Sequence, residues 1–139
     1  MPVMTLPQIE ELCRDALLRA GASSEQATIV AAEIADAEAE GIRNVGLGYM
    51  HLYLKHLKVG KVNPKAAPKV VKTSAASTVI DGDFGFCHHA YLIGESRLID
   101  TAREQGVGLM SIYQSSSAGV LGWFVRRLAQ QGLVSLMFA

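Results

Sequence analysis

Apolar residues recur at helical spacing in three successive runs over the first sixty positions of the chain. The first run follows Thr5-Leu6-Pro7-Gln8, which combines a capping box with a proline in the first turn. Ser23-Ser24-Glu25-Gln26 repeats this start signal before an alanine-rich run, which Gly41 stops. Two lysines near the end of the third run stand where the helix dipole favours cations. We therefore predict helices over residues 5–21, 23–41 and 47–60.

The spacing of apolar residues changes after Asn63-Pro64, where prolines break the helical pattern. Lys69–Thr73 and Ser77–Ile80 are short, rich in β-branched residues and typical of strands, and Asp81-Gly82 is typical of a turn. Beyond this turn, segments of helical and strand pattern alternate. They are predicted as a helix over residues 91–105, a buried strand over 108–113, a helix over 119–131 and a central strand over 133–139.

Strands separated by helices require crossover connections, which indicates an α/β layer rather than a sandwich. We predict a mixed α/β (α+β) fold in one compact unit, with a three-helix layer at 1–62 and an incomplete sheet with crossover helices at 63–139. The sheet is expected to be incomplete because the chain ends at Ala139, inside an uncharged apolar strand. A partner chain or a longer polypeptide would have to cover that strand. We therefore expect a homo-oligomer, most simply a dimer.

The composition excludes several functional classes. Of 139 residues, 50% are hydrophobic, and 13 Lys and Arg balance 13 Asp and Glu, as in an ordinary soluble globular protein. Nucleic-acid binding is not expected without a basic stripe. The charge-free run between Glu104 and Arg126 holds serines and glycines, so it is no membrane span, and the N-terminus lacks a signal-peptide pattern. We expect a cytoplasmic protein in which Cys13 and Cys87 are reduced thiols.

The best candidate for a site is the loop Gln114-Ser115-Ser116-Ser117-Ala118-Gly119, where a predicted strand ends and a predicted helix begins. Such a turn offers backbone N–H groups and the positive end of a helix dipole to an anion. The loop matches neither a dinucleotide-binding glycine motif nor a Walker A motif. Serines also cap helices well, and the local pattern favours a capped helix start over phosphate binding.

No metal site is predicted. His88-His89 are adjacent, so their side chains point apart, and we expect them at a helix start on a surface turn. His51 and His56 would lie on different faces of the third helix. Asp81-Gly82-Asp83 has an ordinary explanation as a solvated turn, and Trp123 and Phe124 are predicted to anchor the core.

Five groups of residues along the chain carry a resemblance to a known family. They are Leu12–Gly21 with Ser24-Glu25-Gln26-Ala27, then Gly46 with Tyr53, Leu57, Gly60, Asn63 and Pro64, then Val79-Ile80-Asp81-Gly82 with Gly85, then Ala102 with Gly106, Val107 and Gly108, and finally Ser115, Gly119 and Gly122. In this order they resemble the malate/L-lactate dehydrogenase-like family of NAD(P)-dependent 2-oxoacid reductases. That group includes ureidoglycolate dehydrogenase and is distinct from the Rossmann lactate dehydrogenases. The resemblance covers nearly the whole chain and the N-terminal portion of the longer family members.

The resemblance implies an activity, a cofactor and a site. Family members transfer hydride between a nicotinamide and C2 of a 2-oxo or 2-hydroxy acid, or a cyclic imine, while the protein orients the reactants and exchanges the proton. NAD or NADP would be the cofactor, and a small 2-oxo acid would be the substrate. Ser115, Ser117, Gly119 and Gly122 fall at the family's site loop and following helix, so the resemblance implies that they contact the cofactor.

The chain departs from the family pattern where the chemistry is expected. A Ser-His-Gly motif at the start of the third helix reads Asn44-Val45-Gly46 here, which removes an imidazole able to exchange protons. An arginine suited to a substrate carboxylate aligns with Tyr49, and Ser117 stands where a second histidine would be. No expected catalytic residue is intact. Two hypotheses stay open: an impaired or incomplete oxidoreductase, and a non-catalytic dimerisation or binding remnant of the family.

Overall fold

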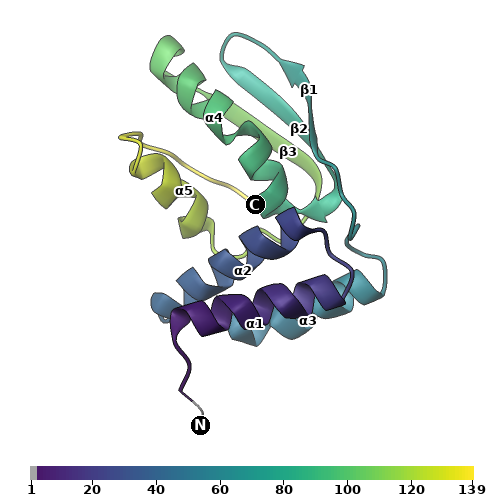
Figure 1. Ribbon diagram of the computed structural model, residues 1–139. Coiled ribbons are helices and arrows are strands. Elements are labelled where there is room, and N and C mark those ends of the chain that lie inside the picture. Colours follow the sequence, from purple (N-terminus) through teal and green to yellow (C-terminus); the bar gives the residue numbers. More distant parts are fainter. Residues whose placement is uncertain (1–2) are drawn as a thin grey trace. The chain divides into compact units, whose positions relative to one another are not determined.

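The computed structural model describes residues 3–139, which divide into one compact unit up to Lys65 and a second from Ala66 (Figure 1). The first unit is helical and the second combines a sheet with two helices, so the predicted mixed α/β fold is confirmed. No helix in the described part of the chain has the length and apolar character needed to cross a membrane.

Three helices form the first unit, as the apolar periodicity predicts. They are α1 (Leu6–Arg19), α2 (Ser24–Ala39) and α3 (Leu47–Lys58). The capping box of α1 is confirmed: the Gln8 N–H donates to the Thr5 hydroxyl, and the Thr5 N–H donates to Gln8 Oε1 at 2.9 Å. Ser23 caps α2 in the predicted way by accepting from the Gln26 N–H.

A buried amide joins the end of this unit to its second helix. The Gln26 side chain is fully buried, and its Nε2 donates to the carbonyls of Asn63 and Pro64 at 3.1 and 3.0 Å. The Ser23 N–H donates to the same Pro64 carbonyl at 2.8 Å. These bonds pair buried polar atoms that would otherwise destabilise the fold, and they tie the segment after α3 to the start of α2.

The second unit is a three-stranded sheet with strand order β1-β2-β3. Its elements are β1 (Lys69–Thr73), β2 (Ser77–Phe86), α4 (Cys87–Gln105), β3 (Leu109–Ser116) and α5 (Leu121–Ala129). Strands β1 and β2 are antiparallel, whereas β2 and β3 are parallel and α4 connects them. The predicted crossover helix is therefore confirmed.

The expected turn at Asp81-Gly82 is wrong, because β2 continues through it to Phe86. Asp83 and Phe84 have φ of 50° and 57°, and the register with β3 shifts between Asp81 and Gly85. The Asp83 N–H donates to Asp81 Oδ1 at 2.9 Å. Turn-forming residues thus produce an irregularity inside a strand here, because β3 pairs with β2 again at Gly85 and Phe86.

Two further strand predictions are wrong: one strand lies at the edge of the sheet instead of being buried, and the other does not form. β3 is the edge of the sheet rather than buried, and its Leu109 side chain is 65% exposed. Residues 133–139 form no strand, and the side chains of Val134, Leu136 and Phe138 are exposed. The physical reason is that apolar alternation shows only that a segment could pair, whereas a strand also needs a neighbour that bonds to its N–H and C=O groups.

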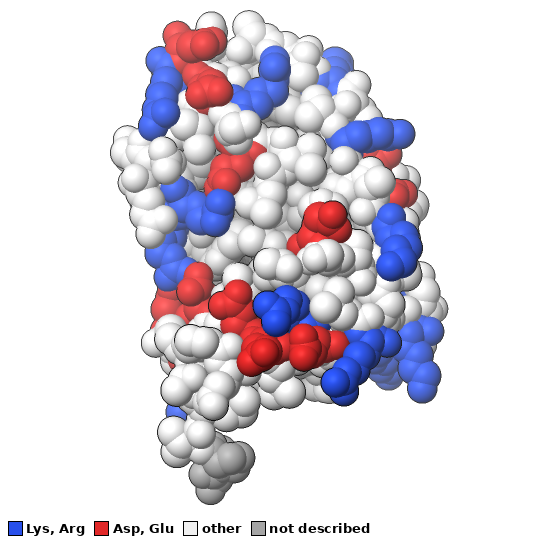
Figure 2. Space-filling model, in the orientation of Figure 1, with Lys and Arg blue, Asp and Glu red and all other residues white. Residues whose placement is uncertain are grey.

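Both charge signs are interspersed over the face of the molecule drawn in Figure 2, with uncharged surface between them. This distribution agrees with the formal net charge of zero.

Candidate functional site

The candidate loop joins the parallel part of the sheet to α5, as its sequence position predicts. Ser115 and Ser116 pair with Gly85 and Phe86 of β2, so β3 fixes the start of the loop. Gln114, inside β3 at the register shift with β2, has a φ of 49°. After the strand, Ser117 and Gly119 have left-handed φ values of 51° and 59°, and they turn the chain out of the sheet toward α5.

The expectation that a serine caps α5 is wrong. The N-cap of α5 is Val120, which provides no side-chain hydrogen bond, and the helix begins at Leu121 rather than Gly119. Left-handed Gly119 cannot continue into a right-handed helix, which explains the later start. Within residues 3–139, the backbone N–H groups of Ala118 and Gly119 form no hydrogen bond. The loop therefore has N–H groups available for a ligand.

Gly82, which the sequence assigns to a turn and to the family resemblance, lies against the candidate loop. A Cβ added to this residue would lie 2.8 Å from the Gln114 carbonyl oxygen and 3.0 Å from Ser115 Cβ. Only a glycine lets β2 approach the loop this closely. The signal in the sequence was a glycine inside a strand pattern, which often marks close backbone approach.

A cavity of about 850 Å³ lies beside the loop, entirely within the second unit. Ser115, Ser117 and the Cys87 thiol are among its polar lining groups, and Tyr91 and Phe124 are among its aromatic ones. Burial raises the pKa of the Cys87 thiol above its usual range, although a hydrogen bond with Ser115 opposes the shift. Cys87 is therefore a protonated thiol at neutral pH and not a nucleophile.

His88 does not lie on a surface turn, because α4 begins at Cys87 and the imidazole is fully buried. Its ring stacks on Phe124 at a centroid distance of 5.2 Å and meets the edge of Trp123 at 5.7 Å. The prediction that Trp123 and Phe124 anchor the core is confirmed. Burial lowers the pKa of His88 to about 3, so the ring is neutral at physiological pH.

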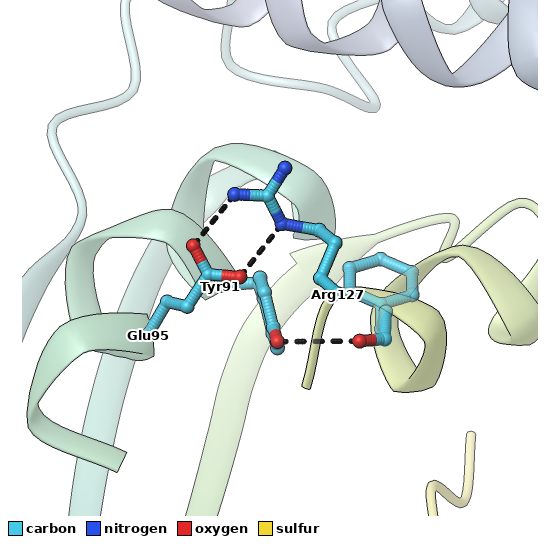
Figure 3. Close-up of polar contacts among 4 residues, drawn as sticks. Tyr91, Glu95 and Arg127 are labelled. Atoms are coloured by element: carbon cyan, nitrogen blue, oxygen red, sulfur yellow. Dashed lines mark hydrogen bonds and ion pairs between the residues drawn. The ribbon is translucent and has the colours of Figure 1, made fainter. Parts of the chain in front are cut away.

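An ion pair joins the two helices of the second unit (Figure 3). Arg127 Nε and Nη2 on α5 donate to the two carboxylate oxygens of Glu95 on α4, each at 2.6 Å. The guanidinium carbon also lies 4.8 Å from the ring centre of Trp123. Tyr91 on α4 donates its hydroxyl to the Phe124 carbonyl at 3.4 Å.

The other predicted site positions lie at the start of α3 in the first unit. Asn44 is exposed and Val45 half-buried, and the ring of Tyr49 meets Tyr53 edge-on at a centroid distance of 5.1 Å. Glu38 was missed by sequence reasoning: its Oε1 accepts from the Leu47 N–H at 2.8 Å and so caps α3. No sequence signal identifies it, because the contact spans nine residues and two helices.

The structure brings the site positions together as two groups, one in each unit. Asn44, Val45 and Tyr49 gather at the start of α3, and the loop with Gly122 gathers at the start of α5. No group of three His, Cys, Asp or Glu side chains that could hold a metal occurs in the described part of the chain. The His51 ring hydrogen-bonds through Nδ1 with the Gly48 carbonyl oxygen at 2.9 Å.

Comparison with known proteins gives a consistent result. A family model described as malate/L-lactate dehydrogenase matches residues 4–139. The chain is 35% identical over 133 residues to a Delta(1)-pyrroline-2-carboxylate/Delta(1)-piperideine-2-carboxylate reductase of Pseudomonas syringae pv. tomato, which is 96% of this chain and 39% of the relative. It is 32% identical over 137 residues to a (2R)-3-sulfolactate dehydrogenase (NADP(+)) of Chromohalobacter salexigens, which is 99% of this chain and 41% of the relative.

A solved structure extends the similarity to three dimensions. The crystal structure of delta1-piperideine-2-carboxylate reductase from Pseudomonas syringae pv. tomato matches with a TM-score of 0.91 at 32% identity. The match covers 95% of this chain and 40% of that one. The chain therefore spans about two-fifths of the length of the relatives it matches.

Proposed function

The chain belongs to the malate/L-lactate dehydrogenase family, and from this premise we propose that the protein is an oxidoreductase, or part of one, that transfers hydride between NAD(P)H and a small 2-oxo acid. The observation that carries the proposal is the family match over residues 4–139. One relative is named as a dehydrogenase and another as a reductase, and both names support hydride transfer as the reaction. The relative named for NADP(+) supports a nicotinamide dinucleotide as the cofactor.

The loop before α5 fits the anionic part of such a dinucleotide. Ala118 and Gly119 offer unbonded backbone N–H groups, and Ser115 and Ser117 line an adjoining cavity of about 850 Å³. Gly122 follows at the start of α5 and is exposed. These residues would hold and orient NAD or NADP, which when bound supplies the hydride.

Acid–base chemistry in this chain differs from the pattern that the resemblance implies. Val45 and Ser117 stand where imidazoles are expected, and Tyr49 stands where an arginine is expected. The buried ring of His88 cannot replace them, because its pKa of about 3 keeps it neutral. A proton for the substrate oxygen would therefore have to come from another group or from water.

These same three positions favour a second candidate function, a non-catalytic remnant that serves as a dimerisation or binding module. The two candidates differ in turnover. We would assay oxidation of NADH and of NADPH by the whole protein with a panel of 2-oxo acids and cyclic imine carboxylates. Turnover supports the oxidoreductase, whereas absence of both turnover and dinucleotide binding would leave only the second candidate.

A double substitution sharpens this test. If the scaffold still positions the cofactor, Val45→His with Ser117→His should raise the rate, because it returns proton-exchanging groups to both positions. The matched control is Val45→Leu with Ser117→Ala, which alters the same positions without adding an imidazole. If the double-histidine variant is no faster than this control, the hypothesis that the site lacks only its proton donors is contradicted.

We further propose that the protein is a cytoplasmic homo-oligomer. Both cysteines are free thiols, which agrees with a reducing compartment. Val134, Leu136 and Phe138 expose apolar side chains that association would cover. Light scattering at tens of micromolar tests the oligomer, and a strictly monomeric species would contradict it.

A further inference from the structure

The link between α4 and α5 is stronger than an ordinary surface ion pair. The Arg127 fork engages both oxygens of Glu95 at 2.6 Å, and the two side chains are only 35% and 16% exposed. The Trp123 ring supports the guanidinium from another side at 4.8 Å. Bidentate, charge-assisted bonds of this length fix orientation as well as distance, and a ring that packs on the guanidinium limits its rotamers.

The candidate loop runs from the end of β3 directly into α5. Val120 caps α5 without a side-chain bond, and the Ala118 and Gly119 N–H groups form no hydrogen bond within residues 3–139. β3 fixes the start of the loop through its pairing with β2 up to Ser116. The position of the loop's end therefore depends on where α5 packs.

Helix α5 has only nine residues; it buries Trp123, Phe124 and Leu128, and polar side chains also join it to α4. Besides the ion pair, Tyr91 donates to the Phe124 carbonyl at 3.4 Å, and Arg103 donates to the Gln131 carbonyl at 3.1 Å from an exposed position. Both bonds are longer than those between Glu95 and Arg127, and neither joins two charges.

We propose that Glu95 and Arg127 are positioning residues: by clamping α5 to α4, they hold the Ser115–Gly119 loop in the conformation that binds the dinucleotide phosphate. That the loop binds a dinucleotide rests on the proposed function, whereas the attachment of α5 to α4 does not. Glu95 lies on α4 and Arg127 on α5, so the pair would act on the loop by fixing the helix that follows it.

The test uses the single tryptophan of the chain, Trp123, which packs against Arg127 and reports how α5 docks. Glu95→Gln keeps the shape of the side chain and removes its charge, and Arg127→Lys keeps the charge but loses the fork. The exchange variant Glu95→Arg with Arg127→Glu restores an ion pair of opposite polarity. Glu104→Gln is the matched control, since it makes the same change at an exposed position of α4.

Three quantities would be measured on each variant of the whole protein: acrylamide quenching of Trp123, backbone amide NMR shifts of Ser115–Gly119, and the Kd values for NADH and NADPH. We expect both single variants to increase quenching, shift the loop amides and raise the Kd about tenfold, the factor expected from about 1.4 kcal/mol. The exchange variant should recover part of each change, and Glu104→Gln should match the wild type.

Either of two results would overturn the proposal that Glu95 and Arg127 position the loop. One is loop amide shifts and quenching that stay at wild-type values in both single variants. The other is a raised Kd accompanied by an equal loss in Glu104→Gln, which would indicate a general effect of charge. If the wild type binds neither NADH nor NADPH, the proposed function fails, while the quenching and the amide shifts still decide the clamp. Should Glu95→Gln not fold, Arg127→Lys carries the same comparison.

Discussion

At the scale of single residues, His88 shows how packing sets the chemistry of a side chain. The sequence places two adjacent histidines after Cys87, a pattern open to several interpretations. In the structure, His88 is fully buried against Phe124 and Trp123, and its pKa falls from 6.5 to about 3. A residue that could have been a proton donor thereby becomes a neutral part of the core.

The buried imidazole should make stability depend on pH. Because the pKa of His88 is lower in the folded state, the unfolded state binds more protons between about pH 6.5 and 3. The free energy of unfolding should therefore fall as pH drops through this window, by up to about 1.4 kcal/mol per pH unit. Urea unfolding at several pH values would measure the slope.

The matched variant for this slope is His88→Gln, which is polar but does not titrate. Its stability at neutral pH can differ from wild type without affecting the comparison, because only the pH dependence is compared. A variant with the same slope as the wild type below about pH 6.5 would contradict the assignment.

Both thiols should be unreactive in the folded protein. Burial, with a contribution from Glu38, raises the pKa of Cys13 to about 11, and burial raises that of Cys87. Since the thiolate is the reactive form, labelling by a disulfide reagent at about pH 8 should be slow in buffer and fast in urea. Rapid labelling of one thiol in the native protein, located by peptide mass, would show that this thiol is accessible.

At the scale of elements, the packing of α4 on the sheet depends on Gly94. A Cβ added to this residue would lie against Ile80 Cδ1 and 2.5 Å from Met110 Sδ, so the helix approaches β2 and β3 closely. Helical pattern alone places α4 correctly, although the helix begins four residues earlier than the predicted Tyr91. The close approach is visible only once three elements are assembled.

Gly94→Ala should destabilise the second unit although alanine is the better helix former. The overpacking cost of about 1–3 kcal/mol exceeds the gain in helix propensity of up to about 1 kcal/mol. Urea unfolding followed by Trp123 fluorescence measures the change. Ser96→Ala, at an exposed position of the same helix, is the control and should be neutral or slightly stabilising. A more stable Gly94→Ala variant would mean that the side chains around it can move apart.

At the scale of the whole molecule, the outstanding feature is the apolar segment after α5. Val134, Leu136 and Phe138 alternate with less exposed residues, and their side chains are 101%, 84% and 88% exposed. Burying such side chains contributes about 25 cal/mol per Å² of apolar area, whether a partner chain or a longer polypeptide covers them. The segment thus has the pattern of a strand without the neighbour that would make it one.

The self-association that we propose should weaken when these three residues are replaced together by serine. Sedimentation velocity or light scattering over a range of concentrations measures the effect. The control is Val59→Ser with Val107→Ser, which removes two other apolar side chains, each 64% exposed. An equal change in both variants would contradict a specific role for the segment, and unchanged association in the triple variant would assign it to another surface.

Local patterns in the sequence were enough to predict the features that depend on residues close together in the chain. The capping box at Thr5 and the apolar faces of the helices require contacts only a few residues apart, and the parallel crossover follows from the order of elements. The family is likewise carried by the order of residues, as the match over residues 4–139 bears out.

Tertiary structure alone decided what depends on residues far apart. It extended β2 past Asp81-Gly82, placed β3 at an edge, left residues 133–139 unpaired, buried His88 and joined Glu95 to Arg127. The physical reason is the same in each case. Strand pairing, desolvation and ion pairing depend on which atoms meet across the fold, whereas periodicity reports only which face of an element is apolar.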